Sequence, residues 1–130
     1  MAVATQIEAP KKIVRRTIAD GTAVPLGTLM KLEDANTVVV SAANSDPFGG
    51  IAVEEKTASD GITNIACAMD GVFMIDSTAA AITAGAIVSI GGANTVAVTT
   101  GTADQVAGSN VGQAEETRDG SNIIRVRLRG

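Results

Sequence analysis

The last part of the chain alternates regularly between apolar and basic side chains. Ile124, Val126 and Leu128 alternate with three arginines. Successive residues of a strand point to opposite faces, so this pattern predicts a strand with one buried and one solvated face. Other short segments are rich in β-branched residues, which suit a pleated sheet. The strands expected on this basis cover residues 13–18, 28–32, 37–41, 48–54, 62–69, 71–75, 86–90, 95–99, 111–114 and 122–128.

Turn-forming residues separate these segments. Asp70-Gly71 is a strong hairpin signal between the strands on either side of it, and residues 33–36 and 91–94 suit tight hairpins. Residues 77–84 predict one helical turn capped by Ser77. Short strands with closely spaced turns are typical of all-β proteins, so we expect a compact small barrel or sandwich with at most one or two short helical turns.

Two stretches of the sequence are similar to each other. Residues 27–41 read GTLMKLEDANTVVVS and residues 85–99 read GAIVSIGGANTVAVT, which is an offset of 58 (85 − 27). The same offset relates Val14 to Val72 and Ile65 to Ile123. The chain therefore divides into pseudo-repeats of about 13–70 and 71–128. We expect the two halves to share one core, because so short a unit buries little surface alone.

The N-terminal residues have no such pattern. Residues 1–9 are small and mixed, and Pro10 follows. We therefore expect residues 1–16 to be a flexible arm in front of a single β domain at 17–130. Such an arm could be deleted without unfolding the domain. It contains the densest basic cluster, which is either a latch for an acidic partner surface or charge that keeps a tail in solution: Lys11, Lys12, Arg15 and Arg16.

Composition narrows the class of protein. Apolar residues make up 45% of the chain but aromatic residues only 2%, so the core must be built from small aliphatic side chains. The net charge of −4 argues against nucleic-acid binding, which depends on neutralising phosphates. No apolar run is long enough to span a bilayer, and the N-terminus lacks the layout of a signal peptide. Cys67 is expected to be a small buried hydrophobe, in keeping with synthesis in a reducing cytoplasm.

The sequence offers little material for catalysis. It contains no histidine and no Gly-Lys dipeptide, which excludes a histidine-based nucleophile relay and a Walker phosphate loop. Glu54-Glu55 and Glu115-Glu116 stand at matching repeat positions. Adjacent strand residues point apart, so we interpret these pairs as solvated strand ends rather than an acid–base site. We predict no catalytic, cofactor-binding or metal-binding residues, and no enzyme.

A carrier domain is a further alternative. The segment CAMDG (67–71) is similar to the biotinyl Ala-Met-Lys-Met loop, and lipoyl and biotinyl domains are also pseudo-duplicated β-structures. However, Asp70 stands where the modified lysine would be required. Without that amine no acyl group can be attached, so the likeness extends to architecture alone.

The order of several short motifs resembles the small phage capsid cement, or head-decoration, proteins of the DUF2190-like group. The motifs are VPLGTLM (24–30), GGIAVEE (49–55), DGVFMID (70–76), AAITAGAIVSI (80–90), VGQAEE (111–116) and IIRVRLRG (123–130). The resemblance covers the chain from about Thr17 onward. It implies a β-tulip-like body, trimers on the outside of an expanded phage head, the major capsid protein as partner, and no catalysis or cofactor.

We therefore expect a structural virion protein that is made in the host cytoplasm and cements the outer capsid surface as a homotrimer, without nucleic-acid or membrane partners. The hypothetical capsid-binding residues are Lys11, Lys12, Ile13, Val14, Arg15 and Arg16. The alternative is a surface adhesin or glycan-binding module of a virion. Glycan sites use aromatic platforms, for which the chain has only Phe48 and Phe73.

Overall fold

The protein is all-β in a computed structural model that describes residues 3–78, 81–99, 108–118 and 122–129. No helix is present among these residues. The helical turn expected over 77–84 is not seen in its described part, and residues 79–80 lie outside it. The strands are β1 (Thr5–Glu8), β2 (Ile13–Thr17), β3 (Leu29–Asp34), β4 (Thr37–Val40), β5 (Phe48–Ala52), β6 (Asn64–Ala68), β7 (Val72–Ser77), β8 (Ile87–Gly92), β9 (Thr95–Val98), β10 (Asn110–Ala114) and β11 (Ile123–Leu128).

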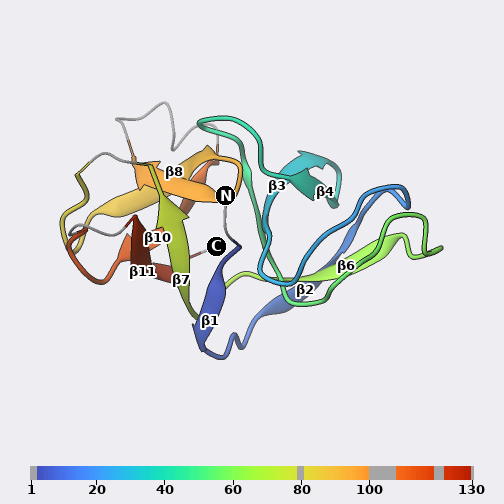
Figure 1. The fold of residues 1–130 in the computed structure, drawn as a ribbon, viewed down its shortest axis with the longest axis horizontal. Helices are drawn as coiled ribbons and strands as arrows, with labels where there is room; N and C mark the ends of the chain where they lie inside the picture. Colours follow the sequence, from blue (N-terminus) through green and yellow to red (C-terminus); the bar gives the residue numbers. More distant parts are fainter. Residues whose placement is uncertain (1–2, 79–80, 100–107, 119–121, 130) are drawn as a thin grey trace.

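The strands form two closed barrels that lie side by side (Figure 1). The first barrel has the strand order β2-β4-β3-β5-β6. The second has the order β7-β9-β8-β10-β11, closed by a parallel pairing of β7 with β9. A parallel pairing of β2 with β4 stands at the same place in the first barrel. The prediction of an all-β barrel protein built from two pseudo-repeated halves is therefore confirmed.

The offset between the halves is not constant, because the segments that connect equivalent strands differ in length from one half to the other. The β3–β4 and β8–β9 hairpins match at the expected offset of 58: Leu32 pairs with Val38, and Ile90 with Val96. For β2 and β7 the offset is 59 (73 − 14), because Val14 pairs with Cys67 of β6 as Phe73 pairs with Val126 of β11.

The predicted match of Ile65 with Ile123, and of Val14 with Val72, is therefore wrong by one residue. A slip of one residue moves a side chain to the other face of a strand. Ile65 is 1% exposed, whereas Ile123 is 45% exposed, and the true counterpart of Ile65 is the buried Ile124.

Each barrel has its own interior, in place of the single shared core expected from the sequence. Residues at equivalent positions fill the two interiors: Met30, Val38, Ala52, Ile65 and Cys67 in the first, and Val88, Val96, Ala114, Ile124 and Val126 in the second. Closing a five-stranded sheet on itself gives each half an enclosed interior. The repeat therefore specifies two small cores rather than one.

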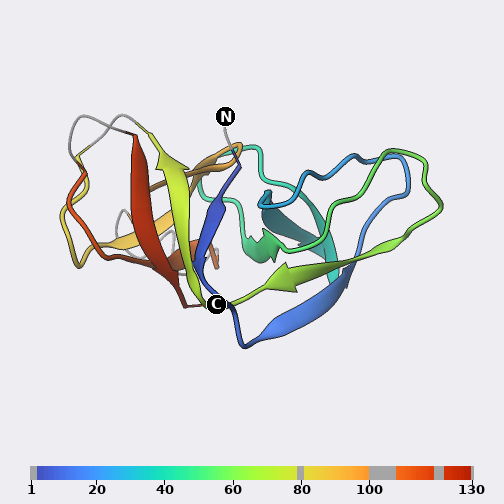
Figure 2. The same cartoon turned by 60° about the horizontal axis from the view of Figure 1, so that its bottom comes forward.

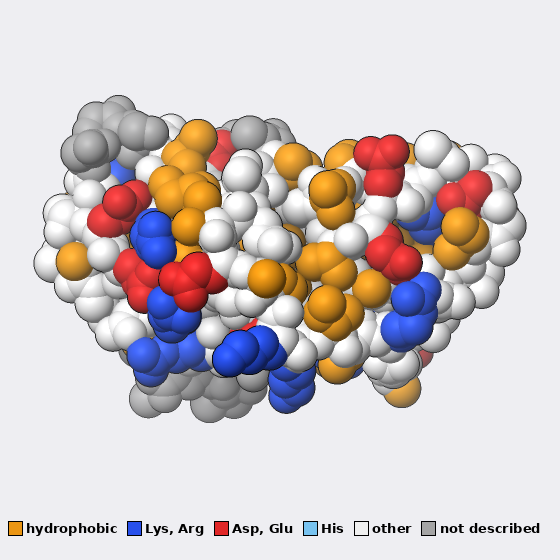
Figure 3. Space-filling model, turned by 90° about the horizontal axis from the view of Figure 1, so that it is seen from below, with side chains coloured by type: hydrophobic (Ala, Val, Ile, Leu, Met, Phe, Trp, Pro, Cys, Tyr) orange, Lys and Arg blue, Asp and Glu red, His pale blue; other side chains and the backbone are white. Residues whose placement is uncertain are grey.

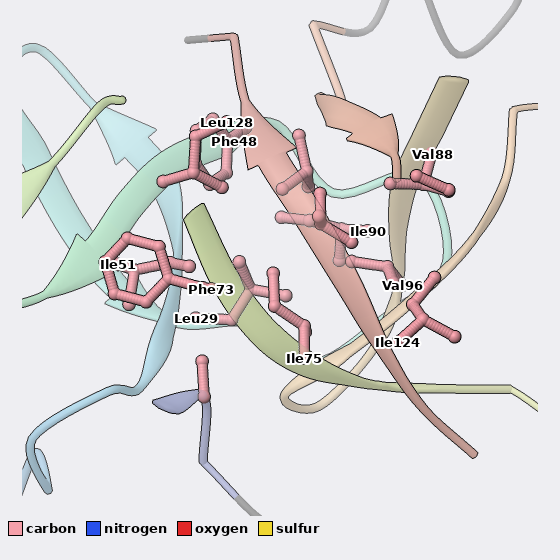
Figure 4. Packing of buried hydrophobic residues seen from close by; sticks show 14 of the residues in the cluster. Leu29, Phe48, Ile51, Phe73, Ile75, Val88, Ile90, Val96, Ile124 and Leu128 are labelled. Carbon is pink, nitrogen blue, oxygen red and sulfur yellow. The ribbon is translucent and has the colours of Figure 1, made fainter. Parts of the chain in front are cut away.

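The two halves are joined by an apolar contact. Leu29, Phe48 and Ile51 point out of the first barrel and belong to the same buried cluster as the interior of the second (Figure 4). The β8–β9 turn adds polar contacts: Asn94 Oδ1 accepts a hydrogen bond from Leu29 N (2.9 Å), and Asn94 N donates to Ser41 Oγ (3.0 Å). The halves therefore form one continuous packed body.

Residues 3–16, the described part of the expected flexible arm over 1–16, do not form a free segment. Thr5–Glu8 forms β1, which pairs antiparallel with β7 of the second barrel, and Ile13–Thr17 forms a wall strand of the first. Ala4 N also donates to Gly27 O (2.8 Å). In Figure 2, β1 lies between the two halves. The segment is ordered because the edge of β7 supplies backbone partners that the sequence pattern does not reveal.

Asp70-Gly71 is also not a hairpin. β6 and β7 belong to different barrels, and Asp70-Gly71 links them. The link lies against the β1–β2 connection, since a Cβ at Gly71 would lie 2.9 Å from Glu8 O. Asp70-Gly71 does bend the chain, but β6 and β7 pair with other strands and not with each other.

Candidate binding surface

The six residues expected to bind a partner lie in and just before β2. The backbone N–H groups of Lys11 and Lys12 both donate to Asp70 Oδ1, at 2.7 and 2.8 Å. This carboxylate fixes the turn that leads into β2. In Figures 1 and 2, β2 lies beside β6 at the lower border of the molecule.

The side chains of these residues divide between two faces of the strand. Lys11, Lys12, Ile13 and Arg15 are exposed. The guanidinium of Arg15 donates to Glu54 Oε1 (3.1 Å) and, through Nε, to Asn64 Oδ1 (2.9 Å). These contacts hold its charge at the surface, where its side chain is 58% exposed.

Val14 and Arg16 face the interior of the first barrel and are half-buried. Arg16 occupies the position of Ile75 in the second barrel. Its guanidinium donates to Asn36 Oδ1 (3.1 Å) and to Met69 Sδ (3.7 Å), while its buried Nε has no hydrogen-bond partner. These two side chains are less available to a partner than the other four.

The carboxylate pairs at the ends of β5 and β10 have a structural role. Glu54 Oε1 accepts a hydrogen bond from Ala66 N (2.8 Å), and Glu116 Oε1 accepts one from Arg125 N (3.1 Å) at the equivalent place. Each carboxylate satisfies a backbone donor of the neighbouring strand. That these pairs do not form an acid–base site stays a prediction.

A charged network on the outer face of the second barrel was missed by the sequence reasoning. Arg127 bonds Glu115 (2.8 Å) and Glu8 (3.2 Å), and Arg125 bonds the same two carboxylates. Figure 3 shows acidic and basic side chains gathered on this half of the face. The two arginines hold the pKa of Glu115 below its usual value, Arg127 contributing most, and Glu115 raises the pKa of Arg127. The network ties β1 to β11.

A buried lysine was also missed. Lys56 is only 3% exposed, and its ammonium donates to Asp20 O (2.6 Å), Thr57 O (3.1 Å) and Asp60 Oδ1 (2.8 Å). The hydrogen bond from Lys56 lowers the pKa of Asp60 from 3.8 to about 2, with help from Ile62 N. All three ammonium donors are therefore satisfied by two loops of the first barrel.

Three further features concern glycan, small-molecule and metal sites. Phe48 and Phe73 are both buried, so neither offers a platform to a sugar ring. A hollow of about 380 Å³ lies between β1 and the first barrel and is lined mainly by apolar side chains, including the exposed Leu26. Among residues 3–78, 81–99, 108–118 and 122–129, no cluster of three or more acidic or cysteine side chains could hold a metal ion.

Comparison with known proteins assigns no family. No family model matches the chain, and no curated protein sequence matches it significantly. In the part of the chain that the structure describes, no helix is long and apolar enough to cross a membrane.

Proposed function

We propose that this protein is a structural virion protein that binds the outer surface of a phage capsid and stabilises the head. The observation that carries the proposal is the basic surface before and on β2, where Lys11, Lys12, Ile13 and Arg15 are exposed together. No ion pair joins the ammonium groups of Lys11 and Lys12 to another described residue. Cations on a rigid strand suit electrostatic docking to an acidic protein surface.

The two-barrel body suits this role as well. A cement protein has to hold neighbouring capsid subunits in fixed positions, and the continuous packing of the two halves provides a stiff connection. The sequence motifs that resemble head-decoration proteins support the same function. The major capsid protein is the proposed partner.

The test is cosedimentation of the full chain with purified expanded phage heads. A triple variant, Lys11→Glu, Lys12→Glu and Arg15→Glu, should abolish binding, and salt should weaken binding of the unmodified protein. Arg118→Glu is the control, because it reverses a charge that lies before the start of β11, whereas the end of that strand lies beside Gly71 and the turn that leads into β2. Binding of the triple variant at the unmodified level would overturn the proposed surface.

We also propose self-association as a trimer. Leu26 is 57% exposed and lines the hollow next to β1 together with Ala4 and Val53, and a contiguous exposed apolar surface is typical of a protein contact. Sedimentation velocity should show a trimer at micromolar concentration, and Leu26→Ser should reduce it. A monomer at that concentration would limit trimer formation to the capsid surface.

A further inference from the structure

The second barrel has an added strand, β1, for which the described part of the first barrel contains no counterpart. β7 pairs with β9 only at its end, at Asp76 and Ser77. Along the rest of that edge β1 fills the gap, with Thr5 opposite Met74 and Glu8 opposite Val72. The second barrel therefore closes with help from an added strand.

In the first barrel, no strand of the described residues fills the same gap. β2 pairs with β4 only at Thr17, although its other edge pairs with β6 along its whole length. Met69 N donates to Lys12 O (2.9 Å) and Ile18 N donates to Thr63 O (3.0 Å). Backbone groups alternate between the two edges of a strand, so those of Ile13 and Arg15 point to the open edge. Asn36 Nδ2 reaches Arg15 O there (3.2 Å).

Side chains of β2, which borders the open gap, are more exposed than the equivalent side chains of β7. Ile13 is 50% exposed, whereas its counterpart Val72 is fully buried. Val14 and Arg16 are half-buried, whereas their counterparts Phe73 and Ile75 are buried. The β2 positions are thus more exposed than their counterparts in β7, which is the strand that β1 pairs with.

The charges around this edge indicate which strand can fill it. Antiparallel pairing of β2 with β2 of a second copy would bring Arg15 and the flanking lysines together, and like charges across strands repel. β1 of a second copy is already held in its own chain, where Glu8 bonds Arg125 and Arg127. An extended segment that alternates apolar and acidic side chains meets both requirements, since it can cover Ile13 and neutralise the lysines.

We propose that the edge of β2 at Ile13–Arg15 is a docking site for an extended, acidic segment of a partner protein, which adds a strand to the first barrel as β1 does to the second. Backbone hydrogen bonds would supply affinity, and the alternating side chains would supply specificity. This inference concerns the mode of binding and holds whether or not the partner is a capsid protein.

The experiment is an NMR titration of the full-length protein with the peptide Ac-EVEIEVE-NH2, with Ac-KVKIKVK-NH2 as the charge-reversed control. The acidic peptide should shift the amide signals of Ile13 and Arg15 in a saturable way at millimolar concentration. It should also slow their hydrogen exchange at least tenfold, because free edge amides become hydrogen-bonded. The lysine peptide should do neither.

Two variants separate strand addition from simple charge attraction. Ile13→Pro removes an amide that faces the open edge, at a strand start that tolerates proline, and should abolish binding while β2–β6 signals remain. Arg118→Gln, which removes a charge before the start of β11, should leave binding unchanged. Equal binding to Ile13→Pro, or no slowing of exchange at Ile13 and Arg15 with saturating peptide, would overturn the proposal. Peptide binding without capsid binding would refute only the proposed function.

Discussion

At the residue scale, the ammonium of Lys56 acts as an internal cation that holds two loops together. It lies among the oxygens of Asp20, Thr57 and Asp60, with its side chain only 1% exposed. Asp20 Oδ1 in turn accepts a hydrogen bond from Gly61 N (2.7 Å). The end of the first barrel that these loops form therefore depends on one side chain.

Lys56→Met should destabilise the protein by about 2 kcal/mol, because it removes the hydrogen bonds that the buried ammonium donates to Asp20 O, Thr57 O and Asp60 Oδ1. Urea unfolding followed by circular dichroism measures this loss. Lys31→Met is the matched control: Lys31 lies 3.7 Å from Asp46 at a more exposed position, and such a pair contributes at most about 1 kcal/mol. If both variants lost the same free energy of unfolding, Lys56 would contribute no more to stability than the more exposed Lys31.

The ion pair of Lys56 with Asp60 also predicts a dependence on pH. The pKa of Asp60 is lowered from 3.8 to about 2 in the folded protein. A carboxyl whose pKa falls on folding stabilises the folded state above its unfolded pKa, and that stability is lost as pH drops through the folded pKa. The melting temperature should therefore fall between pH 4 and pH 2.

In Asp60→Asn this part of the decline should disappear. The remaining decline should include a contribution from Glu115, whose pKa is lowered by Arg127 and Arg125. Thermal melts of the two proteins across the pH range compare the slopes directly. Parallel curves for the two proteins would contradict the assignment.

At the element scale, the sequence predicted strands well and their partners less well. All ten predicted strands are present as β2 to β11. Their β-branched residues favour an extended backbone, and their alternating side chains match the two faces of a sheet. β1 was missed because Thr5–Glu8 is exposed along its length and has no apolar alternation. Its conformation comes from the edge of β7, which is distant in the sequence.

The register of the repeat shows a second limit. The β3–β4 and β8–β9 hairpins could be matched because each is a local unit with Asn36 or Asn94 at positive φ. Matching Ile65 to Ile123 failed because loop lengths between strands differ from one half to the other, and no local pattern records that difference. For the candidate surface, the sequence located the basic cluster, but the inward direction of Val14 and Arg16 follows from barrel closure.

Gly27 and Gly85 allow a matched test of how β1 is held. Both have a φ near +90°, so alanine should cost each about 1 kcal/mol of backbone strain. At Gly27 the new Cβ would also lie 2.2 Å from Ala4 O, whereas nothing lies within 4 Å at Gly85. Gly27→Ala should therefore displace the start of β1 as well.

Hydrogen exchange distinguishes the two outcomes. Gly27→Ala should speed exchange of the amides shared by β1 and β7, and Gly85→Ala should leave them protected. Both variants should keep the β2–β6 ladder. If exchange in β1 rose equally in the two variants, the contact between Ala4 and Gly27 would not be what fixes the strand.

At the scale of the whole molecule, the two barrels differ most on the face by which the first contacts the second. Leu29 and Ile51 are buried in that contact. Their counterparts in the second barrel are Ile87, which is 37% exposed, and Gln113, which bonds Gly85 O and Arg129. The face of the first barrel is apolar and buried, whereas the equivalent face of the second combines an exposed isoleucine with a glutamine, so the two faces are not interchangeable.

Ile51→Gln tests this contact, because it places on the first barrel the residue found at the equivalent position of the second. The change should cost about 3–5 kcal/mol, since it removes apolar burial and leaves a buried amide without a designed partner. The barrels should then unfold at different urea concentrations. Cys67 reports on the first barrel, because burial raises the pKa of its thiol to about 11 and keeps it unreactive while that interior is closed. Hydrogen exchange of β10 and β11 reports on the second.

Ile65→Ala is the control for this experiment. It removes a comparable amount of buried surface from the interior of the first barrel but leaves Leu29, Phe48 and Ile51 in place. With the contact intact, thiol labelling and hydrogen exchange should change over the same urea range. If Ile51→Gln also kept the two probes in step, the halves would be coupled through β1 and the Asp70-Gly71 link rather than through the apolar face. That result would mean that the two barrels unfold together because these backbone segments connect them, and not because their side chains pack against each other.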